Sequence, residues 1–305
     1  MKLATTTGDF GRFCSTYEEC VENVCEAGFK YIDLNMYTPS EDGRLLIRED
    51  WRDCVESIRK VADKYGAKFV QAHSPGKGNP IYKDEYYDNL VKMTKRSIEV
   101  CGALGIKNTV VHAGTLDGVS KDEFFQRNRE FFRLLIPEME KCGVNVLCEN
   151  STNANMRGKY FTNSGKDMLE FVKCLDHPLF HACWDTGHAN IEGSQYDEIM
   201  TLGDELYAVH INDNRGKADE HIIPYLGTLN MDEIMNALID SGYKGYFTFE
   251  CDDSLIKPKN WIASRRVFEK DTRLLQPQLF MQKHMERLLY EIGEYALKAY
   301  NCFEE

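Results

Sequence analysis

Short apolar or β-branched runs alternate with amphipathic stretches along almost the whole chain, from Lys2 to about Leu297. Such runs are typical of buried strands, and a helical period in the stretches between them is typical of helices that pack on one face. Eight runs predict strands: Lys2–Thr6, Tyr31–Leu34, Lys68–His73, Asn108–His112, Asn145–Glu149, Phe180–Asp185, Leu206–Ile211 and Tyr246–Glu250. Helical patterns follow at Thr16–Ala27, Trp51–Tyr65, Asp84–Leu104, Lys121–Lys141, Gly165–Leu175, Gln195–Leu202, Met231–Asp240 and a terminal stretch beginning near Asn260 or Gln278.

Eight consecutive strand–helix units predict an α/β protein, a closed (β/α)8 TIM barrel, because right-handed crossovers leave few other architectures for so many parallel strands. Glycines support the repeat, since five predicted helices are each followed by a glycine two to four residues before the next strand: Gly28, Gly66, Gly105, Gly143 and Gly242. No linker or low-complexity segment interrupts the pattern. We therefore expect one domain over residues 1–305, with the barrel over about 1–250 and a C-terminal helical extension of closing helices over 260–305.

Charge and cysteine content narrow the class of protein. The 37 basic and 49 acidic side chains give a net charge of −12, which disfavours a diffuse nucleic-acid-binding surface but leaves room for a local basic groove. The 11 cysteines contain no C-x-x-C pair and predict reduced, mostly buried thiols. No run approaches the roughly 18 apolar residues of a membrane span, and the amino-terminal residues lack the apolar run of a signal peptide. We expect a cytoplasmic protein with no membrane partner.

Polar residues that can carry chemistry stand at or next to the ends of six predicted strands. They are His73, His112, Glu149, Asp185, His210 and Glu250. Because the carboxyl ends of barrel strands meet around one centre, we expect these side chains to converge. A single histidine at a strand end is ordinarily a hydrogen-bonded core or surface residue. The whole set, imidazoles and carboxylates without cysteine, favours a site for a divalent metal such as Zn, Mn, Co or Fe(II).

Several motifs carry a family resemblance. They are Leu147–Asn150 (LCEN), Cys183–His188 (CWDTGH), His210–Asn214 (HINDN), Asp219–His221 (DEH) and Pro224–Thr228 (PYLGT). The chain resembles the sugar isomerase/epimerase superfamily, whose members have a xylose isomerase-like barrel. That superfamily includes ketose 3-epimerases, inosose isomerases and dehydratases and, more distantly, the endonuclease IV class of abasic-site nucleases.

The resemblance to the epimerase branch implies a function and a site. One divalent ion, Mn or Zn first and Mg, Co or Fe as alternatives, would be held by Glu149, Asp185, His210 and Glu250, with no organic cofactor. Glu149 and Glu250 would be the catalytic residues of an isomerase or epimerase that acts on a ketose or related keto-sugar. The reaction would proceed through a metal-bound enediolate, with one glutamate removing a proton from the sugar and the other returning one. A small-molecule sugar is the expected partner, and dimers or tetramers are common in the family.

Other residues near the strand ends are candidates for substrate binding or additional metal. His188 could reach a sugar oxygen or a second ion, or could hold Asp185 or the backbone. Arg215, on the loop after the seventh strand, could bind an anionic group or be an ordinary solvated charge. The remaining candidates of this kind are His73, His112, Asp219 and His221.

Three alternatives to the isomerase stay open. With the four central residues, His73, His112, His188, Asp219 and His221 match the three-zinc set of the endonuclease IV class. Gly187 stands where that class favours Cys or Ala, and residues 74–78 lack the apolar wedge that such nucleases insert into a duplex. An inosose dehydratase-type lyase is a near neighbour of the isomerase, because the same enediolate can expel a β-hydroxyl. A barrel that only binds a sugar would have no need for the complete ligand set.

Overall fold

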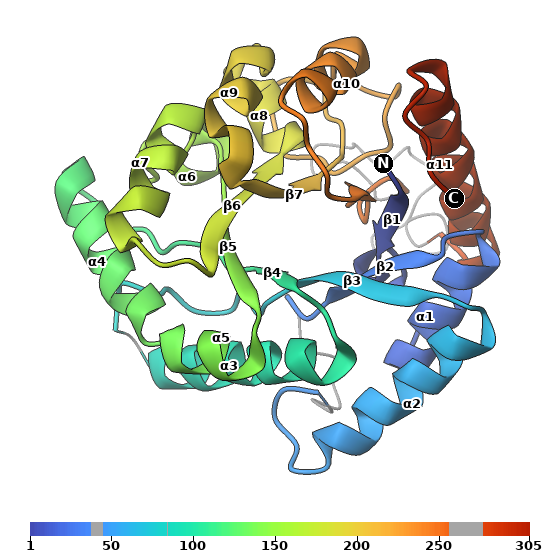
Figure 1. Ribbon diagram of the computed structural model, residues 1–305, viewed down its shortest axis with the longest axis horizontal. Helices are drawn as coiled ribbons and strands as arrows, with labels where there is room; N and C mark the ends of the chain where they lie inside the picture. Colours follow the sequence, from blue (N-terminus) through green and yellow to red (C-terminus); the bar gives the residue numbers. More distant parts are fainter. Residues whose placement is uncertain (38–44, 84, 256–276) are drawn as a thin grey trace, which may run out of the picture.

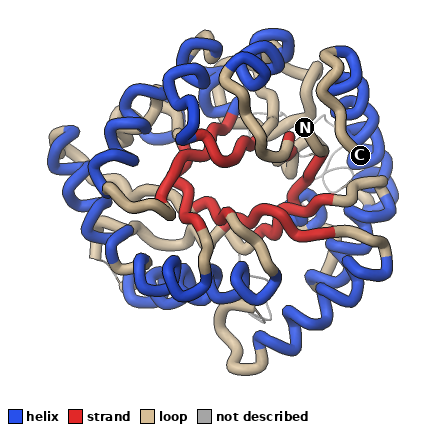
Figure 2. The backbone as a smooth tube through the Cα atoms, in the orientation of Figure 1, coloured by secondary structure: helices blue, strands red, loops and turns tan. Residues whose placement is uncertain are grey.

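Eight parallel strands form a single ring-shaped sheet. The computed structural model describes residues 1–37, 45–83, 85–255 and 277–305. The strands pair in the order β7-β6-β5-β4-β3-β2-β1-β8, and a bridge between Ile211 and Phe249 joins the two ends of the sheet. Their bounds are β1 Leu3–Thr6, β2 Tyr31–Asn35, β3 Lys68–His73, β4 Asn108–Val110, β5 Asn145–Glu149, β6 Phe180–Asp185, β7 Leu206–His210 and β8 Phe247–Phe249. Figures 1 and 2 show this ring with helices around its outside, which confirms the predicted TIM barrel.

The helices follow the predicted pattern with two kinds of difference. Their bounds are α1 Tyr17–Glu26, α2 Trp51–Lys64, α3 Tyr87–Leu104, α4 Lys121–Arg133, α5 Ile136–Cys142, α6 Asn153–Met156, α7 Gly165–Leu175, α8 Thr186–Glu192, α9 Tyr196–Leu202, α10 Met231–Asp240 and α11 Leu279–Ala299, with 3-10 helices η1 Thr7–Phe10 and η2 Gly203–Glu205. The single helix predicted over Lys121–Lys141 is wrong. It divides into α4 and α5 because Pro137, in the first turn of α5, cannot continue a helix through its own position. The short helices η1, η2, α6 and α8 were not predicted.

Apolar residues fill the inside of the ring below the site residues. Val110, Leu147, Cys183 and Ala208, on four neighbouring strands, form a buried cluster of their own. Side chains two residues apart on a strand point to the same side of the sheet. Glu149, Asp185 and His210 follow three of these residues by two positions and therefore also point inward, above the cluster.

Helix α11 is the predicted C-terminal extension, and it packs against the seam between β1 and β8 (Figure 1). A Cβ on Gly293 would lie 2.6 Å from a Leu3 side-chain atom and 2.7 Å from the Phe249 ring, so glycine allows this close approach. Leu289 and Leu297 are buried. The part of the expected extension over residues 260–276 lies outside the described residues. Within the described ranges, no helix is long and apolar enough to cross a membrane. All 11 cysteines are free, as predicted.

Two buried carboxyl groups join α11 to the barrel. Glu286 of α11 accepts a hydrogen bond from the Thr5 hydroxyl at 2.7 Å, and Asp9 of η1 accepts one from the Cys251 backbone N–H at 3.2 Å. Burial raises the pKa of Glu286 to about 7. Burial and the neighbouring charges of Glu286 and Asp252 hold the pKa of Asp9 well above its ordinary value. The pair therefore favours a protonated state when the helix is docked.

We expect the stability of the protein to depend on the ionisation of Glu286. Because the pKa of Glu286 is raised in the folded state, its contribution to the free energy of unfolding is full below the ordinary carboxyl value of 4.5. That contribution is lost as the pH rises through about 7. A shift of this size corresponds to on the order of 3 kcal/mol. Glu286→Gln should therefore flatten the decline of the melting temperature between pH 4.5 and about pH 7. Glu291→Gln, at an exposed position of the same helix, is the control. Identical pH profiles for wild type and Glu286→Gln would contradict this role.

Candidate metal and catalytic site

A cavity of about 280 Å³ opens at the carboxyl ends of the strands. Seven of the residues predicted for the site line it: His73, His112, Glu149, His188, Asp219, His221 and Glu250. Asp185 and His210 are fully buried next to these residues. Arg215 does not line the cavity: its guanidinium, 56 % exposed, pairs with Glu220. The structure thus brings together nine of the ten predicted site residues.

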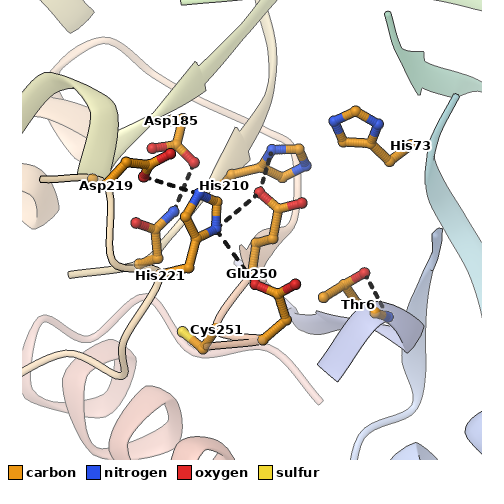
Figure 3. A network of polar contacts seen from close by, with 12 residues as sticks. Thr6, His73, Asp185, His210, Asp219, His221, Glu250 and Cys251 are labelled. Atoms are coloured by element: carbon orange, nitrogen blue, oxygen red, sulfur yellow. Dashed lines mark hydrogen bonds and ion pairs between the residues drawn. The ribbon is translucent and has the colours of Figure 1, made fainter. Parts of the chain in front are cut away.

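The central group consists of Glu149, Asp185, His210 and Glu250. Figure 3 labels the last three of these residues. One donor atom from each residue lies within 4.8 Å of those of the other three. His210 Nδ1 contacts Glu149 Oε1 and lies 3.3 Å from Glu250 Oε2. A single ring nitrogen has at most one hydrogen to donate, so it cannot satisfy both carboxylates.

This donor set fits a divalent cation. Three buried carboxylates in one small volume are costly unless positive charge balances them. Three carboxylate oxygens and one imidazole nitrogen are ligands that Mn²⁺, Zn²⁺ and related ions accept. The four residues that the sequence analysis assigns to a metal are therefore the residues best placed to hold one.

Three further groups of metal-ligand type overlap the central one in the part of the chain that the structure describes: His73, His112 and Glu149; Glu149, Cys183 and His210; and Asp185, His188 and His221. His73 Nε2 lies 3.1 Å from His112 Nε2, which lies 2.6 Å from Glu149 Oε2. On the other side, Asp219 lies 3.2 Å from His188 Nε2 and 3.0 Å from His221 Nε2. Glu149 belongs to the first two of these groups as well as to the central one.

The two glutamates differ in proton affinity. Burial acts to raise the pKa of Glu149, but the charge of His210 and hydrogen bonds from His112 and His210 outweigh it and hold that pKa well below its ordinary value. Burial raises the pKa of Glu250, and the charges of His210 and His221 oppose this only in part. Carboxyl groups whose environments push their pKa values apart are typical of sites that transfer protons.

Local structure after β6 fixes Asp185 and His188. Asp185 is the N-cap of α8 and accepts a hydrogen bond from the His188 backbone N–H at 2.6 Å, which explains why a helix begins directly at the strand end. His188 Nδ1 lies 2.9 Å from the Asn150 carbonyl, so Nε2 faces Asp219. Burial lowers the pKa of His188, but the charges of Asp185 and Asp219 raise it to about 10. Both predicted contacts of His188, to Asp185 and to the backbone, are present.

Asn212 is a supporting residue to which the sequence analysis gave no role. Its side-chain amide donates to Asp185 Oδ2 at 2.6 Å and so fixes the second carboxylate oxygen. Gly187 leaves the space for this amide, because a Cβ at position 187 would overlap Asn212 Oδ1. Residues that orient a metal ligand in this way commonly affect metal affinity.

We expect Gly187→Ala to weaken metal binding by displacing Asn212 from Asp185. Overpacking of a buried position also lowers the free energy of unfolding, by about 1–3 kcal/mol. Titration calorimetry with Mn²⁺ and thermal melts would measure the two effects. Gly158→Ala, at a φ of +75° where a Cβ strains the backbone but meets no atom within 4 Å, is the control for a loss of stability alone and should leave Mn²⁺ affinity unchanged. Unchanged Mn²⁺ affinity in Gly187→Ala would show that Asn212 does not position Asp185.

Other residues at the site were missed by the sequence analysis. Asp33, inside β2, lies 3.4 Å from His210 Nε2. A buried acid in a strand whose neighbours are apolar was a signal that could have found it. The Tyr37 ring lies 5.0 Å from the His73 ring and lines the cavity, as does Arg12. Both follow strands in irregular segments, where no period predicts which way a side chain points.

This chain is similar to known proteins in sequence and in fold. A family model described as xylose isomerase-like TIM barrel matches residues 21–271. The fructoselysine 3-epimerase of Shigella flexneri is 47 % identical over 210 residues, covering 64 % of this chain and 72 % of that protein. The D-psicose 3-epimerase of Ruminiclostridium cellulolyticum is 29 % identical over 246 residues, covering 77 % of this chain and 78 % of that protein.

A solved structure agrees in fold. A D-tagatose 3-epimerase-like protein has a TM-score of 0.75 at 19 % identity, over 99 % of this chain and 98 % of that one. At this identity the likeness concerns the fold alone. The family model, however, spans most of the sequence and includes the motifs at Glu149, Asp185, His210 and Glu250. The chain therefore belongs to the xylose isomerase-like TIM barrel family.

Proposed function

We propose that the protein is a divalent-metal-dependent isomerase that epimerises a ketose at the carbon next to its carbonyl. The observation that carries this proposal is the placement of Glu149 and Glu250. Both belong to the four-residue donor group, and both line the cavity. Glu149 ends β5 and Glu250 directly follows β8, and β6 and β7 separate these two strands in the ring, so the two carboxylates extend into the cavity from different strands. The similarity to two 3-epimerases supports the same conclusion.

The proposed chemistry needs two groups that move a proton. A ketose that loses the hydrogen beside its carbonyl develops negative charge on oxygen, and a divalent cation held by the four residues would supply the balancing charge. One glutamate takes the proton from one face of the sugar, and the other returns a proton to the opposite face. His188 lines the cavity, but the Asn150 carbonyl and Asp219 occupy its two ring nitrogens, so a hydrogen bond to a sugar oxygen would have to replace the one to Asp219.

Two sugars from the relatives are the substrates to test first: D-psicose and fructoselysine, a ketose that carries a lysine on its first carbon. Metal-replete protein should interconvert one of them with its C3 epimer, which NMR would follow directly. Loss of water from the sugar instead of epimerisation would identify the lyase alternative. Failure of both sugars, and of a wider panel of ketoses and inososes, would overturn the proposal.

We also propose a cytoplasmic location, since 11 free cysteines fit a reducing compartment.

A second candidate is a nuclease for abasic sites. The specific observation in its favour is that four overlapping groups of metal-ligand type lie at or beside the cavity in the described residues, and that three of them share Glu149. Clustered metal ions can activate water and stabilise a leaving oxygen in phosphodiester cleavage. A duplex with one abasic site, incubated with Zn²⁺-loaded protein, tests this candidate. Nicking at that site without turnover of any sugar would favour the nuclease.

A further inference from the structure

An ion pair lies at the mouth of the cavity. Arg12 Nη1 lies 2.8 Å from Asp253 Oδ1, and the side chains are 56 % and 39 % exposed. Asp252, 37 % exposed, is the next residue toward the site and also lines the cavity. Arg12 follows η1 after β1, and the two aspartates follow β8, the strand that pairs with β1. One side of the mouth therefore carries one positive and two negative side chains.

The charges at the mouth differ in kind from those of the buried site. Among the described residues that line the cavity, Arg12 is the only one with a lysine or arginine side chain. The buried donor group uses carboxylates and imidazoles that suit a cation and a sugar. A sugar bound there has no charge to match an arginine. The mouth therefore fits a second part of a substrate, one that extends outward from the sugar.

An α-amino acid group matches this arrangement. Its carboxylate suits the planar guanidinium of Arg12, which binds carboxylates through two parallel hydrogen bonds. Its ammonium suits the carboxylate of Asp252, which leaves Asp253 to hold Arg12 in place. Tyr37 and Met156 line the same cavity and offer apolar surface to a methylene chain between the two ends.

We propose that Arg12 and Asp252 determine specificity for ketoses that bear an amino acid on the first carbon, Arg12 by binding the carboxylate and Asp252 by binding the ammonium. The inference rests on the proposed ketose epimerase and goes further by assigning the substrate class and the residues that select it. Plain ketoses would occupy the inner part of the cavity without contacting either residue.

Three ketoses test the proposal with metal-replete protein. They are fructoselysine, the fructose adduct of cadaverine, which keeps the terminal amine but lacks the carboxylate, and D-psicose. Arg12→Gln should raise KM for fructoselysine about 10- to 100-fold, the effect of losing a charge-assisted hydrogen bond, and leave KM for the cadaverine adduct and psicose unchanged. Asp252→Asn should raise KM for both amine-bearing ketoses and not for psicose. Arg127→Gln is the matched control, because Arg127 forms an exposed ion pair with Glu123 on α4.

Calorimetric affinity for fructoselysine should fall in parallel with the rise in KM. Equal changes in KM for all three ketoses would show that the Arg12–Asp253 pair only shapes the mouth. An unchanged KM for every ketose would show that the pair does not contribute to substrate binding. Either result overturns the inference. Turnover of psicose but not of fructoselysine by the wild type would overturn the inference and leave the proposed function standing. Turnover of neither by the wild type would overturn both.

Discussion

Glu250→Gln is expected to lower kcat by roughly 10²- to 10⁴-fold or more. This is the contribution that a positioned proton-transfer group makes to the rate. The substituted amide keeps the shape of the side chain but cannot take or give a proton at the sugar carbon. Because one of the two glutamates acts on each face, loss of either stops epimerisation in both directions. Turnover of the active ketose, followed by NMR, measures the effect.

Two measurements accompany this variant. Glu250 also belongs to the metal-ligand group, so elemental analysis should establish that the variant still carries its metal at the concentrations assayed. Thermal melts should show an intact fold. Glu123→Gln, an exposed glutamate paired with Arg127 on α4, is the control for a carboxylate-to-amide change. Full activity in metal-loaded Glu250→Gln would refute the mechanism with two carboxylates.

Removal of divalent metal is the second change with a large expected effect. Without a cation, Glu149, Asp185 and Glu250 lie close together in a buried volume, and only Glu149 and Glu250 have His210 as a shared partner. Dialysis against a chelator should therefore abolish turnover and lower the melting temperature. Re-addition of Mn²⁺ at about 100 times its Kd should restore about 2.7 kcal/mol of stability.

The metal experiment has a clear contrary outcome. Protein shown by elemental analysis to be metal-free, yet fully active on its ketose, would show that the four-residue group does not serve through a cation. A comparison of Mn²⁺, Zn²⁺, Co²⁺ and Mg²⁺ in the reconstitution would identify the ion that supports the highest kcat. A melting temperature that none of these ions changes would also contradict a metal site at these residues.

The sequence predicted the barrel well because its strands are strongly apolar and regularly spaced. The bounds predicted for β3, β5 and β6 agree with the structure residue for residue. Where the prediction failed, local chemistry overrode the period. Pro137 ends the helix predicted through Lys141, and Asp185 starts α8 by capping it directly after β6. The pattern of apolar residues does not reveal either event.

The strand-end rule also accounts for how much of the site was predicted. Residues at the ends of β3, β5, β6 and β7 converge because the carboxyl ends of parallel strands meet around the centre of the barrel. For Arg215 the sequence left two roles open, and the structure shows it outside the cavity on a loop, paired with Glu220. Arg12 and Tyr37 were missed because no period governs an irregular segment. The catalytic and metal-binding roles of the converged residues remain predictions that the variants above test.

Hydrogen exchange at the reacting carbon tests the central claim most directly. Metal-replete protein is incubated in heavy water with its active ketose, and deuterium at C3 is measured by NMR and mass spectrometry. Proton transfer by Glu149 and Glu250 predicts one deuterium at C3 of the epimer formed. Metal-loaded Glu250→Gln should form no deuterated epimer, because Glu149 alone can exchange the C3 hydrogen on its own face of the sugar but cannot invert C3. Conversion to the epimer with no deuterium at C3 would contradict the account.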